Sequence, residues 1–112
     1  MRRGEAHTLL VRACRTYLRV RGHMAWICPT GLATYGKNRV PYGVPGTPDV
    51  HGILRPSGRF IGVECKTGNA VMTRLQEIAR DEITDAGGLY VEARTIDDVH
   101  DALIELQTSH PD

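Results

Sequence analysis

Two short strand-like segments joined by a turn sequence constrain the fold of this chain more than any other feature. Residues 49–54 and 59–66 have the length and composition of β-strands, and Arg55-Pro56-Ser57-Gly58 between them has turn composition. Such a pattern predicts an antiparallel β-hairpin.

The second segment separates an apolar set of side chains from a charged pair. Glu64 and Lys66 are two residues apart, so they project from one face of the strand. In an antiparallel hairpin the start of the first strand lies opposite the end of the second, which places Asp49 beside Glu64 and Lys66. The positions expected to face the core are Ile61, Val63 and Cys65.

Two carboxylates and an ammonium at one point suit metal-dependent chemistry on a phosphodiester. Carboxylate oxygens are ligands that Mg²⁺ or Mn²⁺ prefers, and such a metal lowers the pKa of a bound water and stabilises the leaving oxygen. An ammonium beside two carboxylates is favoured in its charged form, so we expect Lys66 to position water or phosphate rather than act as a general base. The alternative is a solvated ion pair of Glu64 and Lys66, worth at most about 1 kcal/mol.

The charges are distributed unevenly along the chain, although the net charge is only +1. Residues 1–66 hold 11 Lys and Arg against 3 Asp and Glu, whereas residues 67–112 hold 3 against 10. A basic half that carries the candidate site favours a protein that binds phosphates. The alternative is charge balancing within one fold.

Length and composition predict a single domain over residues 1–112. No apolar run approaches a membrane span and no signal peptide opens the chain, so we expect a cytoplasmic protein without membrane contact. The cysteines are odd in number and share no Cys-x-x-Cys spacing, and we expect them to be reduced core residues: Cys14, Cys28 and Cys65.

Periodicity predicts three helices and two further strands. The helices are expected over 5–21, 73–86 and 96–107, with Gly22 closing the first and Thr95 capping the third. The strands are expected over 24–28 and 89–93, which gives the order α-β-β-β-α-β-α. The helix positions expected to be buried are Ala6, Leu9, Leu10, Ala13, Cys14, Tyr17 and Leu18, then Leu75, Ile78, Ala79, Ile83 and Ala86, then Val99, Ala102, Leu103 and Leu106.

Residues 29–47 are predicted to form one long irregular loop, because glycine and proline recur throughout. Long loops in compact domains are often functional. This one mixes basic, amide and tyrosine side chains, which contact phosphates and stack on bases; the alternative is a disordered surface loop. With Arg12 on the outer face of the first helix, the predicted DNA contacts are Lys37, Asn38, Arg39 and Tyr42.

Together these motifs resemble the PD-(D/E)XK nuclease superfamily, and within it the virus-type replication-repair nuclease (VRR-NUC) domain. The resemblance is carried by Arg39-Val-Pro-Tyr-Gly43-Val-Pro-Gly46-Thr-Pro48-Asp49, by Val63-Glu64-Cys65-Lys66 and by Gln76. It implies an α/β fold with an αβββαβ core, a mixed central sheet and a C-terminal helix.

The resemblance also implies roles for individual residues. It assigns Mg²⁺ or Mn²⁺ binding to Asp49, Glu64 and the backbone carbonyl of Cys65. It makes Lys66 catalytic and Gln76 a supporting member of the catalytic set. It lets Glu5 reach the metal through water.

Several of these residues also have local interpretations. Thr73-x-x-Gln76 spells a capping box, in which Gln76 would satisfy a helix-start amide and never touch the site. Glu5 near a helix N-terminus is favoured by the macrodipole alone. His51 is expected to be a packed or solvated histidine, and the remaining histidines form no ligand spacing: His7, His23, His100 and His110.

The function that the resemblance implies is a homodimeric, structure-selective endodeoxyribonuclease of phage or bacterial origin. Two copies would present two active sites, which suits paired incisions in branched DNA such as a Holliday junction. The alternatives are an archaeal-type junction resolvase, a restriction-like enzyme with sequence-specific cleavage, and a non-catalytic DNA-binding module on the same scaffold.

Overall fold

A mixed four-stranded sheet forms the centre of the computed structural model, which describes residues 3–29 and 31–109. Its strands are β1 (Met24–Ile27), β4 (Val50–Ile53), β5 (Phe60–Cys65) and β6 (Leu89–Ala93), in that spatial order. The first three are antiparallel neighbours, and β6 runs parallel to β5. A parallel pair needs a crossover connection, which α2 (Arg74–Asp85) supplies.

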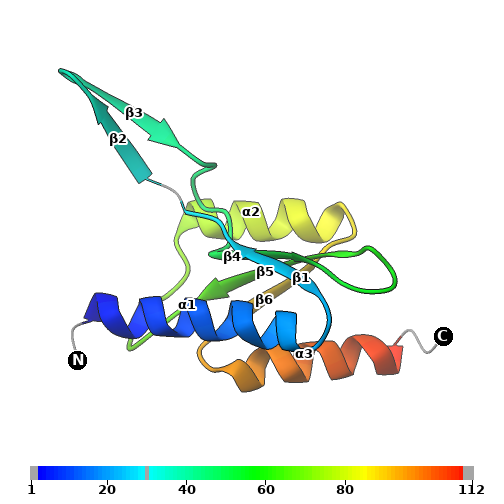
Figure 1. Ribbon diagram of the computed structural model, residues 1–112. Helices are drawn as coiled ribbons and strands as arrows, with labels where there is room; N and C mark the ends of the chain where they lie inside the picture. The colour runs from blue at the N-terminus through cyan, green and yellow to red at the C-terminus, as the bar shows by residue number, and fades with distance from the viewer. Residues whose placement is uncertain (1–2, 30, 110–112) are drawn as a thin grey trace.

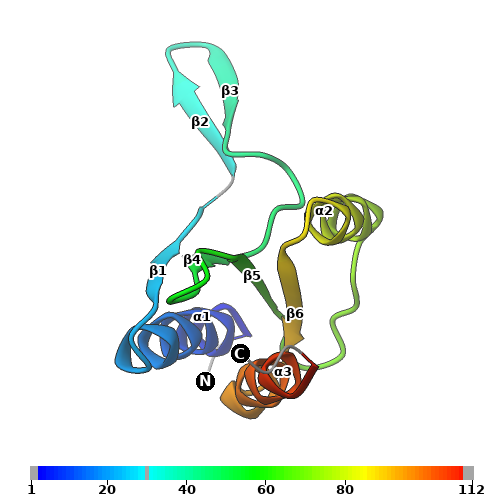
Figure 2. The same cartoon turned by 90° about the vertical axis from the view of Figure 1, so that its right-hand side faces the viewer.

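Helices cover the two faces of this sheet unequally. As Figures 1 and 2 show, α1 (Arg3–Val20) and α3 (Ile96–Ser109) lie on one face, while α2 lies on the other. The hydrophobic core fills the space between the sheet and the two helices α1 and α3. Its members include Val11, Cys14, Leu18, Val50, Ile61, Val63, Cys65, Val91, Val99 and Leu103.

These elements confirm the predicted α/β class with a mixed sheet and a C-terminal helix. The predicted hairpin is β4 and β5, with Val50 opposite Val63. At the predicted cap of α3, the Asp98 carboxylate accepts the N–H of Thr95 at 3.2 Å. The burial predicted for α3 is also confirmed, because Val99 and Leu103 are buried and Ala102 and Leu106 pack against the core.

The prediction of an irregular loop over residues 29–47 is wrong. The chain there forms a two-stranded antiparallel ribbon of β2 (Gly31–Tyr35) and β3 (Asn38–Tyr42), which stands away from the sheet (Figure 1). Gly36, with φ of +64°, occupies the first of the two turn positions, as a tight type II′ hairpin turn requires. Both strands are edges, where proline and glycine are tolerated. The element order therefore gains two strands.

The core face predicted for α1 is confirmed in part, because four of its members are buried or pack against the core: Leu10, Cys14, Tyr17 and Leu18. Val11 is buried with Cys14 and Leu18, whereas Leu9 is 51% exposed. The buried stripe follows steps of three and four residues along one side of the helix, and Leu9 lies off it.

The predicted burial of α2 is wrong for most of its apolar residues. None is buried; Leu75 is 54% and Ile78 37% exposed, Ala86 is exposed, and Ala79 and Ile83 are half-buried. The helix packs against β6 at one side of the sheet, and no other helix of the described residues lies with it on that face. The sheet covers the apolar side of α2 only in part, which leaves most of its apolar residues exposed.

The segment that leads into β4 is fixed by two close contacts with glycine. Gly46 has φ of +85°, and a Cβ there would collide with the carbonyl oxygen of Leu75 in α2. Pro48 is fully buried and lies on Gly62, where a Cβ would come within 2.6 Å of the proline ring. These contacts determine where the next residue, Asp49, can lie.

We predict that Gly46→Ala destabilises the protein by about 2 kcal/mol or more, because a side chain there meets both an unfavourable φ and the Leu75 carbonyl. Urea unfolding followed by circular dichroism measures the loss. Gly58→Ala is the matched control, since Gly58 has φ of +78° with open space around its Cβ position. Its expected loss is about 1 kcal/mol, and equal losses at the two positions would contradict the contact with α2.

Candidate active site

The charged pair at the end of β5 is buried. Glu64 is 3% and Lys66 7% exposed, and the Lys66 Nζ lies 3.5 Å from the Glu64 Oε2. The solvated ion pair considered from the sequence is therefore wrong. Desolvating a buried ion pair costs free energy, so this pair is not explained by the solubility that charged surface residues provide.

Asp49 lies at the same end of the hairpin, as predicted. It directly precedes β4, and its Oδ2 accepts the backbone N–H of Cys65 at 2.9 Å. The register, with Val50 opposite Val63, sets Asp49 across from Glu64. The side chain of Asp49 is 26% exposed, so the carboxylate pair has one buried member and one that reaches solvent.

Gln76 combines the two interpretations that the sequence left open. Its backbone N–H donates to the Thr73 hydroxyl, and its Oε1 accepts the Thr73 N–H, which completes a capping box at the start of α2. The same Oε1 accepts from the Lys66 Nζ at 2.6 Å, and its Nε2 donates to the Glu64 Oε2 at 3.2 Å. One amide thus caps the helix and holds the charged pair.

Arg94, which follows β6, holds the loop between β5 and α2 by side-chain hydrogen bonds. Its guanidinium donates to the carbonyl oxygens of Gly68 at 3.0 Å and Ala70 at 2.6 Å. Because this loop carries the chain from Lys66 to the start of α2, these bonds help to set where Gln76 meets the charged pair.

His7 joins the candidate site, and the sequence interpretation missed it. The His7 Nε2 lies 3.3 Å from the Asp49 Oδ2, which brings α1 to the carboxylates. His7 continues the buried stripe of α1 towards the N-terminus, four residues before Val11. Recognising that stripe would have directed attention to this histidine.

Burial and like charge shape the electrostatics of the pair. Burial first, and then the negative charge of Asp49, raise the pKa of the Glu64 carboxyl to about 8, against the opposing effect of the Lys66 ammonium. Burial and then the charge of Glu64 also raise the pKa of Tyr90, which lies on the neighbouring strand. The site therefore has a deficit of positive charge that one lysine does not fill.

A divalent cation fits this deficit and this donor set. No cluster of three or more His, Cys, Asp or Glu side chains suited to a metal occurs within residues 3–29 and 31–109. Mg²⁺, however, binds through one or two carboxylates together with water and substrate oxygens, which Asp49 and Glu64 satisfy. The Cys65 thiol is in the core, 3.9 Å from the Cys14 thiol, so only the backbone of Cys65 is free to face the site.

The other predicted site residues lie at varying distances from the carboxylates. Glu5 is exposed in the first turn of α1, and its link to a metal through water stays a prediction. Arg12 is exposed and lines a pocket of about 370 Å³ together with His7 and Asp49. Lys37, Asn38 and Arg39 are exposed on the ribbon.

Two of the residues named from the sequence fall outside the described part of the chain. They are the side chain of Tyr42 and the whole of His110. His51 lies within the described residues and is a packed histidine, one of the two alternatives expected from the sequence. Its ring makes edge-on contacts with Trp26 and Phe60, and burial lowers its pKa.

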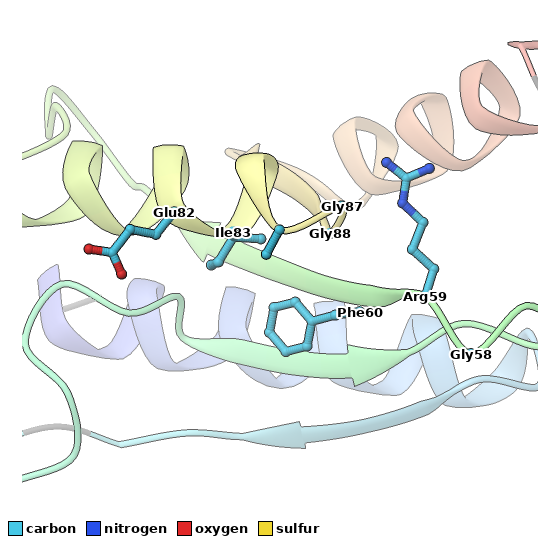
Figure 3. A pocket seen from close by; sticks show the side chains of 8 residues that line it. Gly58, Arg59, Phe60, Glu82, Ile83, Gly87 and Gly88 are labelled. Carbon is cyan, nitrogen blue, oxygen red and sulfur yellow. The ribbon is translucent and has the colours of Figure 1, made fainter.

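A second hollow, of about 470 Å³, lies at the opposite end of β5. Figure 3 shows its apolar floor of Phe60 and Ile83, with the charged groups of Arg59 and Glu82 pointing away from each other. A lone carboxylate and a lone guanidinium do not form a catalytic set, so the candidate site is the group of residues around Asp49.

Comparison of the chain with models of protein families and with curated proteins finds no match. What the site does therefore has to be argued from its residues. No helix of the described residues is long and apolar enough to cross a membrane.

We predict that the free energy of unfolding, measured without divalent metal, falls as pH rises from 4.5 to about 8. Between these values the folded chain keeps a proton on Glu64 that the unfolded chain releases, so the stabilisation is complete below pH 4.5 and is lost by about pH 8. One proton accounts for a slope of at most about 1.4 kcal/mol per pH unit.

Urea unfolding at a series of pH values in the presence of a chelator measures this slope. Glu64→Gln is expected to remove the contribution of this one group, since glutamine does not titrate. The same slope in Glu64→Gln as in the parent protein would contradict the raised pKa.

Proposed function

We propose that this protein is a metal-dependent endodeoxyribonuclease with an active site of the PD-(D/E)XK type, similar to that of the VRR-NUC domain. One observation carries the proposal: Asp49, Glu64, Lys66 and Gln76 meet at the end of β5 with too little positive charge for two carboxylates. A buried carboxylate beside a second carboxylate is costly to maintain unless a cation joins them.

Mg²⁺ or Mn²⁺ bound there would neutralise charge on the scissile phosphate and lower the pKa of a water. Asp49 and Glu64 would hold the cation, together with the backbone carbonyl of Cys65, which directly follows Glu64 in the sequence. His7 and the Cys65 N–H orient the Asp49 carboxylate.

Lys66 acts by position. Its ammonium is held by the Gln76 amide at 2.6 Å and by Glu64 at 3.5 Å, which fixes the charge where a phosphate oxygen or the attacking water can meet it. Hydrolysis leaves a 5′-phosphate and a 3′-hydroxyl.

DNA is the proposed substrate because of the charge around the site. Between Glu5 and Asp49 the sequence has no acidic residue, and this stretch includes Arg12 and the ribbon with Lys37 and Arg39. The positive charges of this stretch attract a polyanion. Branched DNA, such as a Holliday junction, is the proposed form.

The proposal includes a homodimer, since resolving a branch takes two incisions and each chain supplies one set of carboxylates. Exposed apolar side chains support association between copies. They include Met24 and Trp26 on β1 and Leu75 and Ile78 on α2.

We predict that the purified protein cuts labelled four-way junction DNA in Mg²⁺ or Mn²⁺, and that Asp49→Ala and Lys66→Ala each reduce cutting at least a hundredfold. Both changes remove a group that touches metal, water or phosphate in the proposed reaction. Flap, random duplex and single-stranded DNA in the same assay separate a junction resolvase from a restriction-like enzyme. Sedimentation of the same samples measures the number of copies.

An equal rate of DNA cutting by Asp49→Ala and the parent protein would contradict the proposal. DNA binding without cutting, and without metal binding that depends on Asp49 and Glu64 in calorimetry, would favour a non-catalytic module instead.

A second prediction separates the two tasks of Gln76. Thr73→Ala removes the hydroxyl that caps α2 and is expected to cost about 1 kcal/mol of stability with cutting retained. Gln76→Ala removes the cap partner and the bonds to Lys66 and Glu64, and is expected to lower cutting at least tenfold at a similar loss of stability. Unfolding and cleavage measured on both variants test this, and equal cutting by the two would show that Gln76 only caps the helix.

A further inference from the structure

Within the described part of the chain, no helix or other strand packs closely against the β2–β3 ribbon. Its strands pair with each other along five residue pairs, from Gly31 with Tyr42 to Tyr35 with Asn38. Figures 1 and 2 show it projecting from the sheet, and the molecule extends 54 Å along its longest axis. A lone two-stranded hairpin is only marginally stable in water, which points to a binding role rather than a structural one.

Both ends of the ribbon return to the candidate active site. Past the end of β1, the Cys28 N–H donates to the Asp49 carbonyl oxygen at 2.9 Å. On the other side, the chain from β3 reaches Asp49 through Gly46 and Pro48, which are held by Leu75 and Gly62. The base of the ribbon is therefore fixed next to the carboxylates.

The side chains of the ribbon divide between its two faces. Residues paired across the strands share a face, so Tyr35 and Asn38 project together, while Arg39 projects with Thr34 from the other face. Lys37 lies in the turn. Tyr35 is 66% exposed, although a large aromatic residue is usually at least partly buried.

The dimensions of the ribbon match a DNA groove. Five residues per strand at about 3.4 Å each give a length of about 17 Å. A major groove about 12 Å wide admits a two-stranded ribbon, and about 17 Å corresponds to about five base pairs.

We propose that the ribbon enters the major groove of duplex DNA beside the cleavage site and grips the duplex about five base pairs away. Lys37 and Arg39 contact phosphates, and Tyr35 and Asn38 face the base edges. This inference rests on the proposed function, and it adds a duplex arm and the groove in which the ribbon lies to the contacts expected from the sequence.

The first test shortens the ribbon. Because Gly31 and Tyr42 are paired neighbours, residues 32–41 can be replaced by a short Gly-Ser linker without moving the ends. Thermal unfolding is expected to stay within error of the parent. Affinity for duplex DNA, measured by fluorescence anisotropy in Ca²⁺ to prevent cutting, is expected to fall at least tenfold, and the hydroxyl-radical footprint to shorten by about five base pairs on one side.

The second test uses one double and one single substitution near the tip of the ribbon. Lys37→Ala with Arg39→Ala is expected to reduce the slope of log affinity against log salt by about 2, because two phosphate contacts are lost. Tyr35→Ala is expected to lower affinity about tenfold with an unchanged salt slope. The matched control is Arg55→Ala, an exposed arginine at the far end of the β4–β5 hairpin, with no expected effect.

The outcomes separate this inference from the function on which it rests. If the intact protein neither binds nor cuts DNA, the proposed function fails and the inference fails with it. If the intact protein cuts DNA and the shortened one binds duplex equally well, the inference is overturned while the function stands. Loss of affinity for single-stranded DNA alone would also overturn it, since the ribbon would then grip unpaired bases.

Discussion

The antiparallel register between β4 and β5 is the constraint on which the rest of the structure depends. With Val50 opposite Val63, the core receives Ile61, Val63 and Cys65 and the opposite face receives Glu64. A slip of one residue would exchange these faces, which would bury the acid in hydrocarbon and expose valine. The pairing that fills the core therefore also sets Asp49 across from Glu64, so stability and the geometry of the carboxylates have one origin.

The polar network on the outer face is coupled to the start of α2 through Gln76. Buried charges are tolerated where each finds partners, and here one amide serves Lys66 and Glu64 while it completes the helix cap. Asp49 is held in the same way by groups from two other elements, the backbone of β5 and His7 of α1. Four parts of the chain thus meet at one point, each fixed by a bond that also belongs to the local structure.

The sequence predicts those parts whose causes are local. Period-two alternation identifies β5 and the face of Glu64 and Lys66, and the Pro/Gly turn identifies the hairpin. It fails where tertiary packing decides: His7 reaches Asp49 only because α1 crosses the sheet there, and Leu75 stays exposed because, among the described residues, no second helix packs beside α2 on its face of the sheet. The ribbon was mistaken for a loop because strand pairing at an unprotected edge tolerates the prolines and glycines that elsewhere interrupt strands.

The ribbon has a consequence for how such a chain can diversify. Its strands bond to each other, and its two ends are secured by contacts at Cys28, Gly46 and Pro48 that do not involve the residues of its tip. Mutations at the tip therefore leave the core, the carboxylates and the helix cap undisturbed. Inherited changes can therefore accumulate at the tip independently of the carboxylate site, as they do in the loops of antibody domains.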